Sequence, residues 1–380
     1  MLTSSRDLTT LAERLAREPR IAFDLEANGF FSYPERICLI QVGFNGEAFL
    51  VDPLAIDDMA PLGKILADPN IEKILHSADY DVRSLYRDWG FRINNLYDTS
   101  IAAAFVGIER LGLGTVAQEL LGIELPKSKR LQRANWGLRP LTEEAVNYAA
   151  GDVLHLMELR DLLGKRLAEK GRTEWAAEEC ARLARVRFNV QDPELAFLSV
   201  KNSKGLDGKA LAVLRSMHSY RISEALRRDI PPFKVISDSV LVELAEDPTQ
   251  ELAKVKGIGI YGREWLARKV KDAIAEGLQA HPVKRPPRAI GVRMTTSHRA
   301  RAKDKLTRLK AWRIEQGKAL ELDPALLWPA ASLERLSRDH GDLDEEYNSP
   351  EVREWQAREF GEPLRLLLAD IPRQQRLESS

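Results

Sequence analysis

The sequence lacks the features of several classes of protein. Only two of its 380 residues, Cys38 and Cys180, are cysteines, which is too few for a disulfide framework or a cysteine-based zinc cluster. No apolar run approaches the roughly 18 residues that cross a membrane, and the first residues show no basic stretch followed by the apolar segment of a secretion signal. We therefore expect a cytoplasmic protein, in a reducing environment, with no membrane partner.

Charge is plentiful but unevenly distributed. Residues 1–200 carry 24 Lys and Arg against 30 Asp and Glu, and because the whole chain has a formal net charge of zero, residues 201–380 are basic. The stretch from Lys284 to Arg313 holds eleven basic residues and one acid, Asp304. An acidic half that can hold cations, followed by a basic half, suggests a polyanionic partner such as nucleic acid. A solvated linker followed by a charged helix would have the same composition.

The hydrophobic pattern predicts a mixed α/β domain in the first half. With 44% hydrophobic residues, the chain is long enough for two or three domains with their own cores. Short apolar runs predict five strands, at residues 21–26, 37–43, 48–52, 71–75 and 95–98. Helical spacing predicts helices over residues 61–67 and 78–89, and one long helix from Thr142 to about Lys170. Strands that alternate with helices predict a mixed sheet flanked by helices.

Beyond about residue 198 the strand signals disappear and an internal repeat is found. Residues 220–222 recur 92 positions later with an aromatic residue in the same place, and residues 263–265 recur 90 positions later. Two small helical domains of similar design explain this repeat. Trp265 and Trp355, which are equivalent in the two copies, are expected in the cores of their own repeats.

Four acids and a tyrosine stand out by position. Asp24 and Glu26 alternate along a predicted strand and so point to the same face. Asp81 falls in the first turns of a predicted helix, and Tyr148 and Asp152 share one face of the long helix. Taken singly, such acids also occur at strand ends and at helix N-termini, where they satisfy the helix dipole. Taken together, converging carboxylates repel unless a divalent ion lies between them, and oxygen-only ligands favour Mg²⁺ or Mn²⁺ over zinc.

The same residues resemble a known family. Asp24-Leu-Glu26, residues 76–81 and Tyr148-x-x-x-Asp152 resemble the three exonuclease motifs of the DEDD superfamily in its tyrosine branch. Residues 127–130 and 136–142 look like the segment before the third motif in the ribonuclease D family. The two helical repeats look like the helicase-and-RNase-D C-terminal (HRDC) domain, present twice.

The resemblance implies an α/β ribonuclease H-like exonuclease domain followed by two small all-α HRDC domains. The implied boundaries are an exonuclease domain at 1–195, a first HRDC-like domain at 198–280, a basic linker at 281–297, a second HRDC-like domain at 298–371 and a flexible tail at 372–380.

The resemblance also implies hydrolysis with two divalent metal ions, Mg²⁺ or Mn²⁺. Asp24 would bridge both ions, Glu26 and Asp152 would complete the site where water is activated, and Asp81 would hold the second ion. Tyr148 would orient the attacking water, because a phenol with a pKa near 10 is a poor base at neutral pH. Attack on the last phosphodiester would release a 5′-nucleotide.

A single-stranded 3′ end must be held by cations along its backbone and by aromatic platforms for its bases. The candidate RNA-binding residues are His76, Lys127, Lys129, Arg130, Arg133, Arg139, Phe31 and Tyr33. The two aromatic residues lie where this sequence departs from the usual ribonuclease D loop, which affects the expected substrate preference. The alternatives are a basic loop on an acidic domain, aromatic side chains in a core, and a packed histidine at a strand end.

The sequence therefore predicts a monomeric, metal-dependent 3′→5′ exoribonuclease that trims the 3′ ends of structured RNA such as tRNA precursors. Two alternatives stay open at this point: the same chemistry on DNA in repair, and a catalytically inactive nuclease fold that binds nucleic acid. The paired C-terminal domains favour RNA, and the presence of all five catalytic-type residues argues against an inactive fold.

Overall fold

The computed structural model describes residues 1–126, 128–259, 264–286, 295–338 and 341–370. The strands of the N-terminal half are β1 (Arg20–Ala27), β2 (Ile37–Phe44), β3 (Glu47–Val51), β4 (Glu72–Leu75) and β5 (Leu96–Asp98). They form one sheet in the order β3-β2-β1-β4-β5. β1, β2 and β3 are antiparallel neighbours, whereas β4 runs parallel to β1 and β5 parallel to β4. The predicted strands and the mixed sheet are confirmed.

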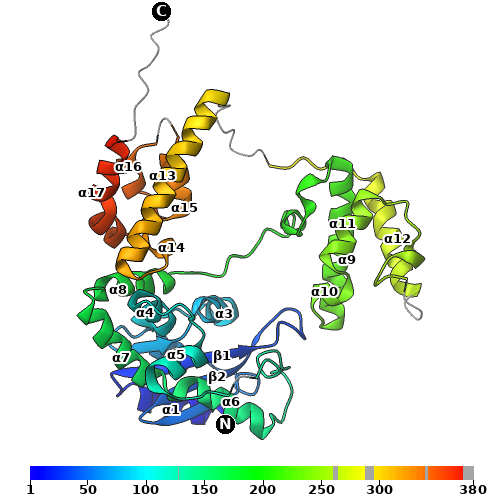
Figure 1. Cartoon of the computed structure of the whole chain (residues 1–380). Helices are drawn as coiled ribbons and strands as arrows, with labels where there is room; N and C mark the ends of the chain where they lie inside the picture. Colours follow the sequence, from blue (N-terminus) through cyan, green and yellow to red (C-terminus); the bar gives the residue numbers. More distant parts are fainter. Residues whose placement is uncertain (127, 260–263, 287–294, 339–340, 371–380) are drawn as a thin grey trace, which may run out of the picture.

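Helices flank the sheet on both faces (Figure 1). They are α1 (Ser5–Leu15), α2 (Ala60–Ala67), α3 (Asp79–Trp89), α4 (Thr99–Val106), α5 (Leu113–Leu121), α6 (Glu143–Leu154), α7 (Leu156–Glu169) and α8 (Thr173–Leu183). Because successive side chains of a strand point to opposite faces, β1 contributes to two cores. Ala22 packs among side chains of α4 and α7, whereas Phe23 packs among those of α1, α2 and α3.

The long helix predicted from Thr142 to Lys170 is two helices, so this prediction needs correction. The predicted start is right, since the Thr142 hydroxyl accepts a hydrogen bond from the Ala145 N–H at 3.2 Å. The helix is interrupted at His155, whose φ of −106° and ψ of 1° lie outside the helical range. α6 covers β1, β2 and β3, while α7 packs on α4 and reaches β4. One straight helix cannot follow both halves of a twisted sheet, and the break allows each half its own helix.

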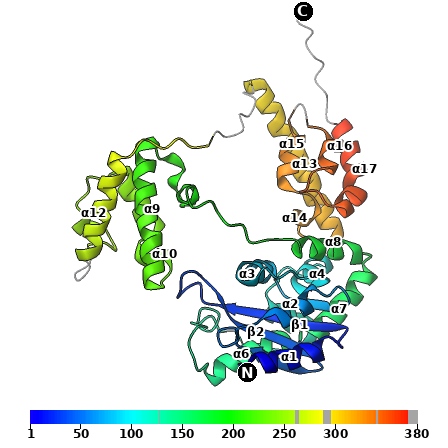
Figure 2. The ribbon, with the colours of Figure 1, turned by 180° about the vertical axis from the view of Figure 1, so that it is seen from behind.

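The first helical domain has a core of its own. It comprises η1 (Ala196–Ser199), η2 (Ser203–Gly205), α9 (Gly208–Arg228), α10 (Pro232–Val235), α11 (Asp238–Glu246), η3 (Leu252–Lys254) and α12 (Glu264–Gln279). Its buried cluster runs from Phe197 to Ile274. Trp265 is only half-buried, at the edge of this cluster. Figures 1 and 2 show the domain apart from the second helical domain, on the same side of the sheet-containing domain.

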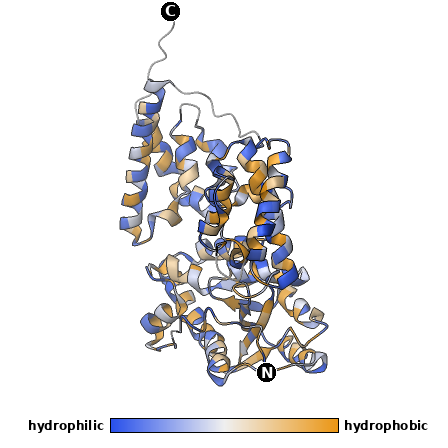
Figure 3. Ribbon diagram, turned by 90° about the vertical axis from the view of Figure 1, so that its right-hand side faces the viewer, coloured by the Kyte–Doolittle hydropathy of each residue, from blue (hydrophilic) through white to orange (hydrophobic). Residues whose placement is uncertain are grey.

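The second helical domain repeats the same succession of helices. It comprises α13 (Thr296–Leu320), α14 (Pro324–Leu327), α15 (Ala330–Leu336), α16 (Leu343–Tyr347) and α17 (Glu354–Asp370). The C-caps of α9 and α13, Asp229 and Glu321, are 92 residues apart and both left-handed, with φ of 48° and 54°. A one-turn helix that begins with proline follows each of them. Both domains mix hydrophobic and hydrophilic residues along each helix (Figure 3), as helices with one buried face do.

The second helical domain shares its core with the sheet-containing domain. Trp355 of α17 stacks on Trp175 of α8 with ring centroids 4.5 Å apart and meets the edge of Phe105 of α4. Arg353 forms a two-pronged ion pair with Glu179 at 2.6 and 3.1 Å. The three aromatic side chains belong to one continuous buried cluster that spans both domains.

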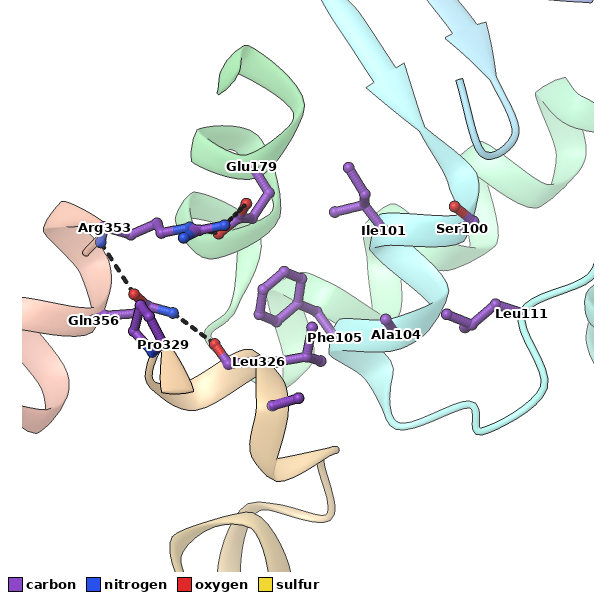
Figure 4. A pocket seen from close by; sticks show the side chains of 11 residues that line it. Ser100, Ile101, Ala104, Phe105, Leu111, Glu179, Leu326, Pro329, Arg353 and Gln356 are labelled. Carbon is purple, nitrogen blue, oxygen red and sulfur yellow. Dashed lines mark hydrogen bonds and ion pairs between the residues drawn. The ribbon is translucent and has the colours of Figure 1, made fainter. Parts of the chain in front are cut away.

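A cavity of about 250 Å³ lies in the seam between α4 and the second helical domain (Figure 4). Figure 4 shows Arg353 directed at Glu179, and Gln356 directed at the backbone carbonyl of Leu326, to which its Nε2 donates at 2.7 Å. None of the four predicted catalytic acids lines this cavity. It is a feature of the junction between the two domains.

Among the described residues, no helix combines the length and the apolar character needed to cross a bilayer. The predicted tail at 372–380 and residues 287–294 of the predicted linker lie outside the described residues.

Candidate active site

Asp24 and Glu26 are positioned by β1, which lies in the middle of the sheet. Their register partners on β2 are Gln41 and Leu39, and a bulge after Glu26 ends the regular pairing. The two acids point to the face covered by α6, because Ala22, two residues earlier, packs against Val153 of that helix. Both side chains are half-buried.

Asp81 is placed by a turn between β4 and α3. It lies in the first turn of α3 and is 6% exposed. The N–H groups of Ser77 and Ala78 donate to the buried carboxylate of Asp98 at 3.1 and 2.8 Å. Asp98 also caps α4 by accepting from the Ser100 N–H at 2.8 Å. Asp98 thereby stabilises the turn that positions Asp81. The spacing of the motifs did not reveal this role of Asp98.

Tyr148 and Asp152 lie one turn apart on α6. This helix packs on β1, β2 and β3, so both side chains are on the same side of the sheet as Asp24. Both are half-buried. The ring of Tyr148 lies 6.2 Å from that of buried Trp136. Residues from three separate motifs therefore face one site.

All four acids have raised pKa values, and the charge of Asp24 contributes to this rise in the other three. Burial, together with the charges of Asp24, Asp152 and Asp81, raises the pKa of Glu26 to about 9. Burial and Asp24 raise the pKa of Asp152 to about 8. Burial raises the pKa of Asp24 to about 7, against a lowering by a backbone hydrogen bond at Leu25. The pKa of Asp81 is raised by burial and by Asp24.

The Tyr148 hydroxyl stays protonated at neutral pH. Burial, followed by the charges of Asp152 and Glu26, raises its pKa above the ordinary value, and a hydrogen bond with Gln132 only partly offsets this. A hydroxyl that keeps its proton can donate a hydrogen bond or orient a water molecule. It does not act as a base at this pH.

Two of the predicted RNA-binding residues use their polar groups within the protein. His76 Nδ1 lies 2.8 Å from the Thr99 hydroxyl and Nε2 lies 2.6 Å from the Leu111 carbonyl. Arg139 forms a two-pronged ion pair with buried Asp52 at 2.6 and 2.7 Å and also donates to the Cys38 carbonyl. The alternative of a packed histidine at a strand end therefore fits His76, and Arg139 ties two parts of the domain together.

The basic segment before α6 is exposed where it is described. Lys129, Arg130 and Arg133 are all exposed, and Arg130 forms an ion pair with Glu144. Lys127 lies outside the described residues. An exposed pair of this kind contributes little to stability, so Arg130 can exchange Glu144 for another anion.

Phe31 and Tyr33 face the first helical domain instead of an open groove. The Tyr33 N–H donates to the Asp229 carboxylate at 3.1 Å, and its side chain packs against the core of that domain. The Lys234 ammonium lies 4.7 Å from the centre of the Phe31 ring. Both side chains therefore serve contacts within the chain, where the sequence predicted platforms for bases.

The donor set fits a divalent cation. No ion pair joins any of the four acids to a Lys or Arg in the described part of the chain. Among the described residues, no three Asp, Glu, His or Cys side chains lie close enough together to hold a metal ion as they stand. Repulsion among carboxylates opposes such an approach. Oxygen-only ligands with raised pKa values match Mg²⁺ or Mn²⁺, whose charge favours the ionised carboxylates.

The fold and the acidic site define a 3′–5′ exonuclease domain followed by helical domains. A family model described as "3'-5' exonuclease" matches residues 1–168, and an HRDC domain model matches residues 210–274. A single HRDC match was found, so the prediction of two HRDC domains is confirmed for the first repeat alone.

Similar proteins extend this match over nearly the whole chain. A ribonuclease D of Zymomonas mobilis is 33% identical over 76% of this chain and 75% of its own length. A ribonuclease D of Granulibacter bethesdensis is 29% identical over 95% and 90% of the two chains. The crystal structure of Escherichia coli RNase D, described as an exoribonuclease involved in structured RNA processing, matches with a TM-score of 0.72 and 25% identity over 98% and 99% of the two chains.

The chain belongs to the ribonuclease D family. It is accordingly a 3′→5′ exoribonuclease, and the predicted reaction class is confirmed.

Proposed function

We propose that this exoribonuclease uses two divalent ions to trim the 3′ ends of structured RNA, such as tRNA precursors, and that it acts as a monomer. The observation that carries the metal requirement is the acidic site itself. Burial raises the pKa values of four carboxyl groups from three elements, and the charge of Asp24 raises those of the other three further. Within the described residues no basic side chain neutralises them, so a bound cation is the economical source of positive charge.

Asp24, Glu26, Asp81 and Asp152 would hold the two ions. When bound, divalent ions supply activation of water and stabilisation of the leaving oxygen. The chain's own contribution begins with Asp24, which is central on the sheet and interacts with all three other acids. The protonated Tyr148 hydroxyl, on the same helix face as Asp152, orients the attacking water.

The RNA backbone would follow the exposed basic segment before α6. Lys129, Arg130 and Arg133 are the candidates that keep exposed cationic groups. Lys127, which lies outside the described residues, is a candidate from the sequence alone. His76 and Arg139 are not included, because protein groups already occupy their nitrogens. Backbone contacts of this kind hold a strand without reading its sequence.

The helical domains would hold the body of the RNA. We propose that the second one, at about 298–371, is also HRDC-like, because its helices and left-handed C-cap recur at the spacing of the first. We also propose that the exonuclease domain ends near residue 195, the first helical domain near 280 and the basic linker near 297. The exposed side chains of Arg299, Lys303 and Lys310 give α13 a basic surface that suits RNA phosphates.

A cleavage time course tests the proposal. Two 5′-labelled hairpins with identical 3′ overhangs, one RNA and one DNA, are incubated with Mg²⁺, with Mn²⁺ and with chelator. We expect a ladder of single-nucleotide steps on RNA that chelator abolishes. An equal ladder on DNA would refute RNA selectivity, and a ladder that persists in chelator would refute the metal requirement.

Asp81→Asn and Asp79→Asn form a matched pair for the same assay. Both acids lie in the first turn of α3, but Asp81 is buried beside Asp24, whereas Asp79 is exposed and pairs with Arg83. Asp81→Asn should lower the rate by a factor of about 10²–10⁴, on the scale of other catalytic groups. Asp79→Asn should leave the rate within about twofold. Equal effects of the two substitutions would show that Asp81 has no special role.

A further inference from the structure

Gln41 is a buried amide without a partner. It lies in β2, a strand in which all eight residues are buried, and its own side chain is 0% exposed. Neither its Oε1 nor its Nε2 has a hydrogen-bond partner. Buried polar atoms are nearly always paired, because an unpaired one loses its bonds to water without replacement. An orphaned amide at the centre of a sheet therefore needs an explanation.

The strand register places this amide beside Asp24. Gln41 and Asp24 are directly opposite each other in the antiparallel pair β1–β2, and opposite residues point to the same face with Cβ atoms about 4.5–5.5 Å apart. On its other side Gln41 is opposite Leu50 of β3, which has no polar side-chain atom. Along β2 the same-face neighbours are Leu39 and Gly43. The acids of β1 are thus the lateral neighbours that can accept its N–H groups.

The helix above Gln41 closes the site from the third direction. α6 packs on both β2 and β3, and Leu39 and Leu50 cluster with Ala145 and Ala149 of that helix. Gln41 is fully buried beneath this helix, beside these apolar side chains. The amide therefore lies in a strand where its same-face neighbours along β2 and across on β3 are apolar, with Asp24 as its acidic neighbour across on β1.

We propose that Gln41 is a positioning residue. Its Nε2–H group, which has no hydrogen-bond partner in this structure, donates to the Asp24 carboxylate when metal is bound and holds it in the orientation of a metal ligand. Gln41 touches neither substrate nor ion and acts only through Asp24. A neutral donor suits this place, because it favours the ionised carboxylate without competing with a cation for the site. The inference rests on the proposed metal-dependent function.

The test compares Gln41→Met with Leu50→Met in the full-length chain. Gln41→Met keeps the length of the side chain and removes both polar atoms, while Leu50→Met makes a volume-conserving change next to it on the same face. Mn²⁺ affinity is measured by titration calorimetry on chelator-treated protein without RNA, and melting temperature is measured on the same samples. The Mn²⁺ dependence of the cleavage rate then separates the apparent metal affinity from the maximal rate.

We expect Gln41→Met to weaken Mn²⁺ binding 10- to 100-fold, the usual effect of removing a group that orients a metal ligand. Saturating Mn²⁺ should restore most of the rate. The melting temperature without metal should not fall, because an unpaired amide is replaced by an apolar side chain of similar shape. Leu50→Met should leave Mn²⁺ affinity unchanged.

Unchanged Mn²⁺ affinity in Gln41→Met would overturn the proposal while leaving the metal mechanism intact. Failure of the wild-type protein to bind Mn²⁺, or an affinity that Asp24→Asn does not alter, would instead reject the proposed function. If Gln41→Met does not fold, Gln41→Leu supplies the same comparison with a shorter side chain. A loss of affinity matched by Leu50→Met would mean that packing, and not the amide, is responsible.

Discussion

The two helical domains share a design but are attached to the exonuclease domain very differently. Each contacts the exonuclease domain through the same feature, the left-handed C-cap of its first long helix. In the first domain this residue is Asp229, which accepts the Tyr33 N–H. In the second it is Glu321, whose carbonyl lies so close to Gly107 that a Cβ there would be 2.8 Å away. Next to that carbonyl, Arg172 donates to the backbone of Leu320.

Beyond this shared feature, the second domain alone buries an aromatic anchor. Trp355 is 1% exposed and packs against Trp175 and Phe360, in a cluster that includes side chains of α4 and α8. Its equivalent Trp265 remains half-buried at the edge of its own domain, beneath Arg228. The exonuclease domain and the second helical domain are thus one packed unit, whereas loop contacts and the connecting chain hold the first.

The difference teaches that a sequence repeat does not determine how each copy is used. The N-terminus of α17 is completed by the exonuclease domain, since Glu178 of α8 accepts the N–H groups of Glu354 and Trp355 at 2.8 and 3.0 Å. A carboxylate at a helix N-terminus satisfies both its free N–H groups and its dipole. The repeated sequence therefore determines the fold of each helical domain, whereas the surface of α8 determines that the second one packs on the exonuclease domain.

The largest effect that would break this comparison is expected from Trp355→Ala. Removal of a buried tryptophan costs about 3–5 kcal/mol, and here the loss falls on a core shared with the exonuclease domain. We expect a lower melting temperature for the unit that contains the catalytic site and reduced cleavage of a short, unstructured RNA oligonucleotide. Differential scanning calorimetry and the oligonucleotide assay measure the two effects.

Trp265→Ala is the matched control for Trp355→Ala. It removes the same side chain at the equivalent position, but from a half-buried site in the first domain. It should lower the stability of that domain alone and leave cleavage of the short oligonucleotide unchanged. Equal losses of activity in both variants would contradict the distinction between a fused and a tethered domain.

Stability should also depend on pH with opposite sign in the two units. In the metal-free protein, Asp24, Asp152 and Glu26 have folded-state pKa values of about 7, 8 and 9, above the roughly 4 of an unfolded chain. The folded state then binds more protons than the unfolded state, so stability falls as pH rises from about 4 to 9. Mn²⁺ should remove this decline by neutralising the carboxylates.

In the first helical domain the sign is reversed. Burial, followed by the charge of Arg221, lowers the pKa of His218 to about 4. The unfolded state therefore binds more protons between about pH 4 and 6.5, and stability rises with pH over that range. Calorimetry at several pH values, with and without Mn²⁺, should show two transitions that move in opposite directions, and only the one containing the acidic site should respond to metal. A single transition that responds as a whole would show that the domains unfold together.

The sequence predicted correctly those features that depend on a short-range pattern of residues. Short apolar runs identified the strands, and the spacing of Asp24, Glu26, Tyr148 and Asp152 identified side chains that the fold brings to one face. Capping chemistry located the start of α6 at Thr142. These signals lie within a few residues of the feature that they predict, and so they can be read without knowledge of the tertiary structure.

Features that depend on distant partners could not be read in the same way. Arg139 had every sign of an RNA-binding residue, because its partner Asp52 lies 87 positions away in the chain. Gln41 did not stand out in its apolar strand, because only the strand register shows that it lies opposite Asp24. The local sequences around Trp265 and Trp355 are alike, so nothing near either residue shows which one meets another domain.

The smallest effect concerns the contact between the first helical domain and the exonuclease domain. Asp229→Gly removes the hydrogen bond that the Tyr33 N–H donates in this contact. Glycine retains the left-handed C-cap at φ of 48° without cost, but it deletes the carboxylate that accepts the Tyr33 N–H. Such an exposed hydrogen bond contributes about 0.5–1.5 kcal/mol, equivalent to a shift of roughly two- to tenfold between docked and undocked arrangements. Stability should therefore hardly change, while the distribution of distances between the exonuclease domain and the first helical domain should become broader.

Energy transfer between dyes at Arg17→Cys and Lys271→Cys measures that separation, since both positions are exposed and the native cysteines are buried. Glu321→Gly is the matched control, because it makes the same change at the equivalent cap of the fused domain. Asp229→Gly should broaden the distance distribution and Glu321→Gly should not. If neither does, the connecting chain and the remaining contacts, those of Lys234 with Phe31 and of the Tyr33 side chain with the core of the first domain, hold that domain in place. The two domains would then differ in how much surface they bury and not in how firmly they are attached.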